Sequence, residues 1–141
     1  MKRIVALMMS LMLLTGSNLT VFATPEEGTF VDDEIIEEYQ YTANVTSSLS
    51  ISGKKASCVS IVHGFSGLAT KVVITQTLQK QRGSTWTYVT SWNKTFNTWL
   101  GSLSNSKSSL SSGTYRLKTV AKVYSGNNYE TITVYSSTAS C

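Results

Sequence analysis

Acidic side chains are almost missing from most of this 141-residue chain. After Glu38 the only carboxylate side chain is that of Glu130, and the single histidine is His63. A glycosidase needs two carboxylates at a fixed separation, and a serine or cysteine hydrolase needs a base held by an orienting group. Neither set can be assembled after residue 38, so the sequence argues against an enzyme.

Metal ligands and nucleotide-binding loops are also scarce. Two cysteines and one histidine give no zinc-binding spacing, and Asp32-Asp33-Glu34 lacks the spacing and glycine of a calcium loop. No glycine-rich phosphate loop occurs. We therefore expect no metal and no cofactor. His63 is expected to end a strand at the surface, without a catalytic role.

Only one long apolar run exists, and it lies near the start of the chain. Lys2 and Arg3 precede the apolar residues 4–14, and Ala23 supplies the small residue that a signal peptidase requires. The run is interrupted at residues 15–18, too early for a membrane-spanning helix of about 20 residues. We predict a helical signal peptide at 1–23, and hence a secreted, extracellular protein whose mature form has no transmembrane segment. An uncleaved membrane anchor is the alternative.

The two cysteines, Cys58 and Cys141, both lie beyond the predicted signal. Two thiols in an oxidising compartment normally pair. We therefore predict a disulfide between Cys58 and Cys141, which the chain-entropy argument values at about 4 to 5 kcal/mol. The alternative is two separate buried thiols.

Charge divides the rest of the chain into two unlike parts. Residues 24–38 carry seven acids and no base, whereas residues 39–141 carry ten bases and one acid, a formal charge of +9. A segment so acidic and poor in apolar residues is not expected to enter a core. We assign 24–38 as a flexible acidic arm and 39–141 as the folded domain. The arm is either a solubilising linker or a mask that neutralises the domain at short range.

The domain shows no helical periodicity. Serine and threonine supply 35 of its 103 residues, with many Val, Ile and Tyr, and no stretch keeps a 3.6-residue apolar period. The pattern predicts an all-β domain of about seven antiparallel strands. We expect them at 45–52, 56–63, 69–80, 85–92, 114–124 and 129–135, with a less regular one at 93–103 and a serine-rich connection at 104–112.

A short segment late in the chain carries a family resemblance. Leu110 and then Gly113-Thr114-Tyr115-Arg116-Leu117 resemble a corner of immunoglobulin-like and fibronectin type III domains, where a tyrosine bonds back to the preceding turn. The resemblance implies an immunoglobulin-like β-sandwich, with Cys58 in the second strand and Trp86 between the sheets. Leu117 stands where an antibody domain has its second cysteine.

Scattered residues of the domain carry a second resemblance. They are Leu78-Gln79-Lys80, Gly83, Trp86, Trp92, Gly113, Tyr115-Arg116-Leu117 and Glu130. In these residues the domain is similar to an uncharacterised family of small exported proteins of Gram-positive bacteria. The resemblance extends over residues 39–141 and implies the same fold. Because the family has no assigned activity, it implies no function.

Basic residues are the strongest indication of a partner. Arg116, Lys118 and Lys122 share one parity of a predicted strand, and Lys80 and Arg82 lie near a predicted hairpin tip. These positions predict a positive face. Ordinary solvated charge is the alternative.

Aromatic residues allow two interpretations. Trp86, Tyr88 and Trp92 share one parity of the strand expected at 85–92. They form either a platform for sugar rings or part of the core. We expect Trp86 and Trp92 in the core and Trp99 exposed.

Together these features favour a non-catalytic binding or interaction module. Its predicted contact residues are Arg116, Lys118, Lys122, Lys80, Arg82 and Trp99. The partner would be an anionic cell-surface polymer, a glycan or another extracellular protein. Nucleic acid is disfavoured, because no groove-reading motif occurs and export is predicted. The alternative is a secreted antagonistic or membrane-active protein masked by its acidic arm.

Overall fold

Alternating inward and outward residues from Thr42 onward form two antiparallel sheets. The computed structural model describes residues 39–141, so the predicted signal at 1–23 and acidic arm at 24–38 lie outside the described residues. One sheet contains, in spatial order, β1 (Thr42–Ser52), β2 (Lys55–Gly64) and β5 (Leu100–Lys107). The other contains β4 (Thr85–Phe96), β3 (Lys71–Arg82), β6 (Thr114–Ser125) and β7 (Asn128–Tyr135), and the short β8 (Ala139–Ser140) pairs with β6.

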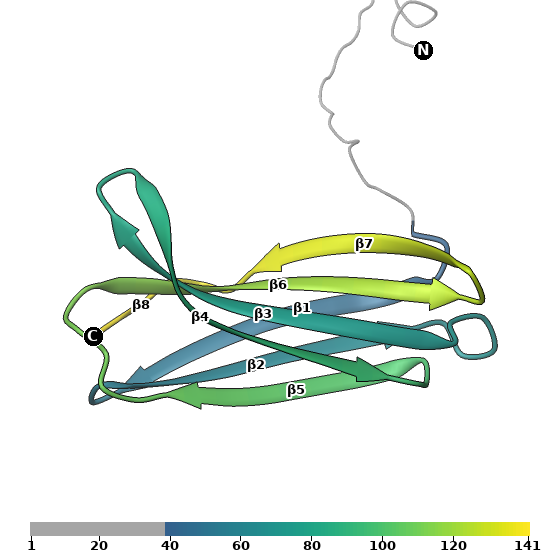
Figure 1. Cartoon of the computed structure of the whole chain (residues 1–141), viewed down its shortest axis with the longest axis horizontal. Helices are drawn as coiled ribbons and strands as arrows, with labels where there is room; N and C mark the ends of the chain where they lie inside the picture. The colour runs from purple at the N-terminus through teal and green to yellow at the C-terminus, as the bar shows by residue number, and fades with distance from the viewer. Residues whose placement is uncertain (1–38) are drawn as a thin grey trace, which may run out of the picture. The chain divides into compact units, whose positions relative to one another are not determined.

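The two sheets pack face to face as a sandwich (Figure 1). Seven main strands, three in one antiparallel sheet and four together with the short β8 in the other, confirm the predicted all-β, immunoglobulin-like sandwich. β4 joins the sheet of β3, β6 and β7, not that of β1, β2 and β5. No helix in this part of the chain is long and apolar enough to span a membrane.

Three tight hairpins connect neighbouring strands of the domain. Gly53, Gly83 and Gly126 begin the two-residue loops between β1 and β2, β3 and β4, and β6 and β7. Each has a φ near +62°, which glycine adopts without a steric cost. These loops fix the register of the three strand pairs.

The interior holds two apolar clusters. The first contains Val62, Ala69, Val72, Ile74, Leu103, Ala121, Val123 and Ile132, and the second contains Ala56, Cys58, Leu78, Leu110, Tyr115 and Leu117. Trp92 packs against both clusters. The prediction that Trp92 lies in the core is therefore confirmed.

A belt of polar side chains links the two sheets across the interior. Its members are Ser47, Ser60, Gln76, Asn105 and Thr119, one each from β1, β2, β3, β5 and β6. The amide nitrogen of Gln76 donates to Ser60 Oγ at 2.9 Å and to a β5 carbonyl oxygen at 2.9 Å, and its Oε1 accepts from Asn105 at 2.9 Å. Thr119 Oγ1 lies 2.7 Å from Ser60 Oγ and donates to Ser47 Oγ at 2.8 Å. A fully bonded buried network of this kind holds one sheet in register against the other.

Tyr115 confirms the corner implied by the resemblance. Its side chain is 1% exposed, and its hydroxyl donates to the Ser111 carbonyl oxygen at 2.6 Å. This bond connects the start of β6 to the loop that precedes it.

β5 differs from the sequence prediction. Residues 104–107 continue a strand that begins at Leu100, where the sequence predicted a connection from 104 to 112. The inward positions of β5 are Gly101, Leu103 and Asn105, which gives little of the Val and Ile signal expected of a strand. Gly101 is required there, because a Cβ atom would meet the Phe96 ring at 2.9 Å.

The predicted disulfide is not formed in the structure, in which Cys58 and Cys141 are both free thiols. Cys58 is buried on the inward side of β2. Cys141 packs against the same apolar cluster, but its Sγ faces the carbonyl oxygens of Gly53, at 3.6 Å, and Leu110, at 3.9 Å. Burial raises the pKa of the Cys58 thiol to about 11, so this thiol is protonated and unreactive at neutral pH.

Candidate functional site

The outer face of the sheet of β3, β4, β6 and β7 gathers three exposed tyrosines and four of the ten basic residues of the domain. Inward residues of β6 are buried, so Arg116, Lys118 and Lys122 point outward together, as their shared parity predicted. Register places further side chains beside them on β3, β4 and β7. We define the basic–aromatic face as Lys71, Trp86, Tyr88, Arg116, Lys118, Lys122, Tyr124, Tyr129 and Tyr135.

A β-bulge in β4 decides which aromatic rings reach this face. Thr90 pairs with Leu78, whereas Tyr88 pairs with Gln79, so Val89 is an extra residue without a partner on β3. The extra residue reverses the alternation of side chains. Trp86 and Tyr88 are therefore outward, although they share sequence parity with the inward Trp92. The prediction that Trp86 lies in the core is wrong for this reason.

Arg116 is held between two aromatic rings at one end of the face. Its guanidinium carbon lies 4.3 Å from the centroid of Trp86 on β4 and 4.1 Å from that of Tyr135 on β7. Its Nε donates to Gln79 Oε1 at 2.7 Å. Each guanidinium–ring contact is worth about 0.5 to 2 kcal/mol, and together they fix a planar group with five N–H donors, of which Gln79 uses one.

Figure 1 shows the end of the β3–β4 hairpin bending away from the rest of the sandwich. Bulges bend and twist the strand that contains them. The bend accompanies the contact between Trp86 and Arg116, which joins the edge strand β4 to β6 across β3.

The opposite end of the face repeats the combination of cation and ring. Lys122 Nζ lies 5.0 Å from the Tyr129 centroid, and Lys71 Nζ lies 4.1 Å from the Tyr124 centroid. The Tyr124 and Tyr129 rings are 5.0 Å apart and tilted by 40°. Arg116 and Lys122 are six residues apart on β6, which corresponds to about 20 Å along the strand.

Three tyrosines of the face are more solvent-exposed than aromatic side chains usually are. Tyr88 is 69% exposed, Tyr129 is 52% exposed and Tyr135 is 48% exposed. Aromatic rings normally contribute to burial, so exposed rings gathered on one face point to a contact surface.

No acidic side chain of the described residues lies on this face. Glu130 pairs with the inward Val123, and its carboxylate accepts hydrogen bonds from the backbone N–H groups of Gln40, at 2.9 Å, and Tyr41, at 2.8 Å. Glu130 thus anchors the chain just before β1. The four cations of the face are left without a carboxylate partner on the same surface.

The structure separates the other three predicted contact residues from this face. Lys80 pairs with Tyr115 on the inward side, and its Nζ lies 2.6 Å from Ser111 Oγ. Arg82 is exposed at the end of β3, on the same parity as Lys80. Trp99 is half-buried against the first apolar cluster, so the expectation of an exposed Trp99 is wrong.

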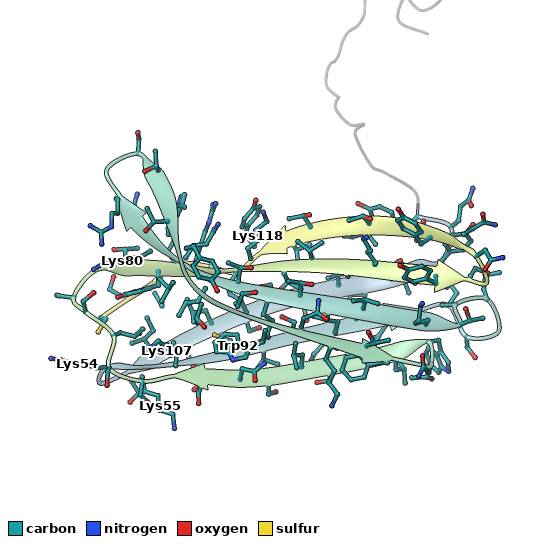
Figure 2. All side chains as sticks on the ribbon, viewed as in Figure 1. Lys54, Lys55, Lys80, Trp92, Lys107 and Lys118 are labelled. Atoms are coloured by element: carbon teal, nitrogen blue, oxygen red, sulfur yellow. The ribbon has the colours of Figure 1, made fainter. Side chains whose placement is uncertain are left out.

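A second basic group lies at one end of the sandwich. Figure 2 shows Lys54, Lys55 and Lys107 close to the β1–β2 turn and the end of β5, away from Lys118. None of these three lysines lies over an aromatic ring of residues 39–141, and Lys107 Nζ donates to the Ser108 carbonyl oxygen at 3.2 Å. We treat this group as solvated charge and as a control for the basic–aromatic face.

The outer face of the three-stranded sheet is chemically different. Its outward residues are mainly Thr46, Ser48, Ser50, Ser52, Lys55, Ser57, Val59, Ile61, His63, Leu100, Ser102, Ser104 and Ser106. His63 is exposed there, and within residues 39–141 no three metal-ligating side chains come together. An open depression on this side lies over β2 and β5.

Comparisons with known proteins add the following. No protein-family model matches the chain, and no curated protein matches it. Similar solved structures include OgpA from Akkermansia muciniphila (12% identity, TM-score 0.40, 69% of this chain and 28% of that chain). Another is a CARDB domain from Pyrococcus furiosus in complex with di-metal ions (14% identity, TM-score 0.39, 77% of this chain and 100% of that chain). A third is a mutant β-glucosidase from Listeria innocua in complex with laminaribiose (13% identity, TM-score 0.38, 69% of this chain and 16% of that chain).

The chain spans less than a third of the length of OgpA and less than a fifth of that of the β-glucosidase. Such low identities and TM-scores support no inference about activity or ligand. The resemblance to the exported family of Gram-positive bacteria gains no support from these comparisons.

Sequence reasoning missed Lys71, Trp86, Tyr88 and the tyrosines of β6 and β7 as members of one face. Tyr124 has the same outward parity as Lys122 on the strand at 114–124, so the sequence could have placed it on this face. Tyr129 and Tyr135 share one parity on the following strand and could have been placed there in the same way. Trp86 and Tyr88 had no such signal, because nothing in the local sequence marks the extra residue in β4.

Proposed function

We propose that the protein is a non-catalytic, extracellular binding module whose basic–aromatic face binds a linear anionic glycan. The observation that carries this proposal is Arg116, held between Trp86 and Tyr135 on a face that has exposed rings and no acid among the described residues. Aromatic rings stack on sugar rings, and a fixed guanidinium binds carboxylate or sulfate groups in a bidentate manner.

The spacing of the cations favours a polymer over a small ligand. Arg116, Lys118 and Lys122 follow one strand over about 20 Å, and Lys71 adds a cation on the neighbouring strand. An extended chain lying along β6 meets all of them, whereas a monosaccharide meets one or two.

The test compares dextran sulfate with neutral dextran by isothermal titration calorimetry, using residues 24–141, which contain the described domain in full. We expect binding to dextran sulfate that weakens steeply with added salt, and none to neutral dextran. Arg116→Ala should weaken binding about tenfold or more, and Arg116→Lys should recover only part of it, because lysine lacks the planar group that stacks between rings.

The matched control removes the same charge elsewhere. Lys118→Ala with Lys122→Ala should weaken binding about tenfold, whereas Lys54→Ala with Lys107→Ala should change it less than twofold. Equal losses in the two double variants would mean that only net charge matters, and the proposal would fail. Absence of binding at low salt would also contradict it.

Export is part of the proposal. Protein recovered from the culture medium should begin at Thr24 by mass spectrometry, the position after Ala23. A different experiment would support the alternative function, that of an antagonistic or membrane-active protein. A chain that begins at Tyr39 would release dye from anionic liposomes, and residues 24–141 would not.

A further inference from the structure

The four long edge strands of the sandwich differ in how they are protected. β1 and β5 are the edges of one sheet, and β4 and β7 are the edges of the other. β4 contains Lys94 and a bulge, β5 ends in Lys107, and β7 contains Glu130. β1 alone has no charged residue and no proline over its 11 residues. Natural sheets usually block exposed edges with such features, so β1 is open to pairing with another strand.

β1 is also regular along most of its length. Its register with β2 is unbroken from Asn44 to Ser52, after an irregularity near Thr42. Its outward residues are Asn44 followed by threonine and serine, and its inward residues include Val45, Leu49 and Ile51. A regular, alternating edge presents a full row of backbone groups to a partner strand.

The inward apolar residues of β1 are incompletely covered. Val45, Leu49 and Ile51 are half-buried, whereas Ala56 and Cys58 on the neighbouring β2 are fully buried. The opposite edge of the same sheet is better closed, because the Phe96 ring of β4 packs over Gly101 of β5. Apolar surface and unprotected backbone therefore coincide at β1.

We propose that β1 pairs with β1 of a second copy, in antiparallel orientation, to form a continuous six-stranded sheet. Centred on Ser48, the regular segment 44–52 overlaps completely with its copy. This register keeps each face intact, because Val45 lies opposite Ile51 of the copy and Thr46 lies opposite Ser50 of the copy.

A second copy fits this edge better than an unrelated strand does. A different partner strand is selected by complementary charge, and β1 offers no charge for that selection. The alternation of β1 is symmetric about Ser48, so it complements itself under the two-fold symmetry common in homodimers.

The experiment measures self-association of residues 24–141 by sedimentation equilibrium at up to about 100 μM protein, where weak interfaces associate. Thr46→Lys with Ser50→Lys places like charges opposite each other twice, and should raise the dissociation constant about tenfold. Thr46→Lys with Ser50→Glu places opposite charges there, and should restore association. Both side chains are exposed, so neither change disturbs the core.

The matched control is Ser102→Lys with Ser106→Lys on β5, which are exposed outward residues of the other edge. This variant should associate as the unsubstituted protein does. The proposal is overturned if residues 24–141 stay monomeric, if both lysine pairs weaken association equally, or if the lysine–glutamate pair does not restore it. Circular dichroism checks that each variant is folded.

Discussion

At the scale of single residues, the fully buried side chain of Gln76 is expected to contribute strongly to stability. Its amide makes three hydrogen bonds to β2 and β5, and its side chain is 0% exposed. Gln76→Leu should lower the free energy of unfolding by about 3 kcal/mol, because the carbonyl group of β5 and the Asn105 amide lose their partner.

The control is the same substitution at a surface position of the same strand. Gln81→Leu, near the hairpin tip, should change stability by less than about 0.5 kcal/mol. Urea unfolding followed by circular dichroism measures both variants. Equal effects would show that the polar belt adds nothing to stability.

The buried thiol of Cys58 should make the free energy of unfolding depend on pH. Burial raises its pKa from 9.0 to about 11, so between these values the folded protein keeps a proton that the unfolded chain has lost. Its contribution to stability is therefore complete below pH 9 and is lost as the pH rises to about 11. Urea midpoints from pH 8 to 11 should fall less steeply for Cys58→Ala than for the unsubstituted protein. Parallel pH profiles would contradict this prediction.

At the scale of the elements, agreement with the sequence follows how regular each strand is. The strand predicted at 114–124 matches β6 within one residue, because its apolar residues alternate with Arg116, Lys118 and Lys122 without interruption. The glycine turns were also predictable, because a glycine between two alternating segments is itself a local signal of a turn. The part of the candidate site that lies on β6 was therefore visible in the sequence.

The missing part depended on tertiary contacts. The sequence prediction ended β5 at residue 103 because its inward positions hold Gly101 and Asn105, which are not typical of a strand. Gly101 leaves room for the Phe96 ring of β4, and Asn105 donates to Gln76 of β3. Trp86 was misplaced because the bulge at Val89 is visible only against the register of β3. The predicted disulfide rested on an assumed oxidising compartment, not on a distance between the two thiols.

The bulge can be tested by removing its extra residue. Deletion of Val89 should remove the bulge but leave Tyr88 paired with Gln79 and Trp86 paired with Gln81, so Trp86 should stay beside Arg116 and binding to dextran sulfate should change less than twofold. Val89→Ala keeps the bulge, and should lower stability by about 1 kcal/mol while leaving binding unchanged. A loss of binding after the deletion as large as that of Arg116→Ala would contradict this and would mean that the bend of the β3–β4 hairpin is itself needed.

At the scale of the whole molecule, charge is unevenly distributed along the chain. Residues 39–141 carry a formal charge of +9, and residues 24–141, with ten bases and eight acids, carry +2. A chain that begins at Tyr39 should therefore bind dextran sulfate more tightly at low salt. The difference should vanish near 1 M salt, where the Debye length is about 3 Å. Calorimetry of the two chains across a salt series measures this, and equal affinities at low salt would contradict it.

The position of β1 in its sheet determines how two joined copies would face a target. Antiparallel neighbours in one sheet are related by an axis perpendicular to that sheet, so both copies keep the same side up. The two ring-and-cation surfaces would then be coplanar and address one polymer layer together, which strengthens attachment without any new contact. The hydroxyl-covered sides would both be turned toward the medium, so an anionic surface coated in this way would become neutral and hydrophilic.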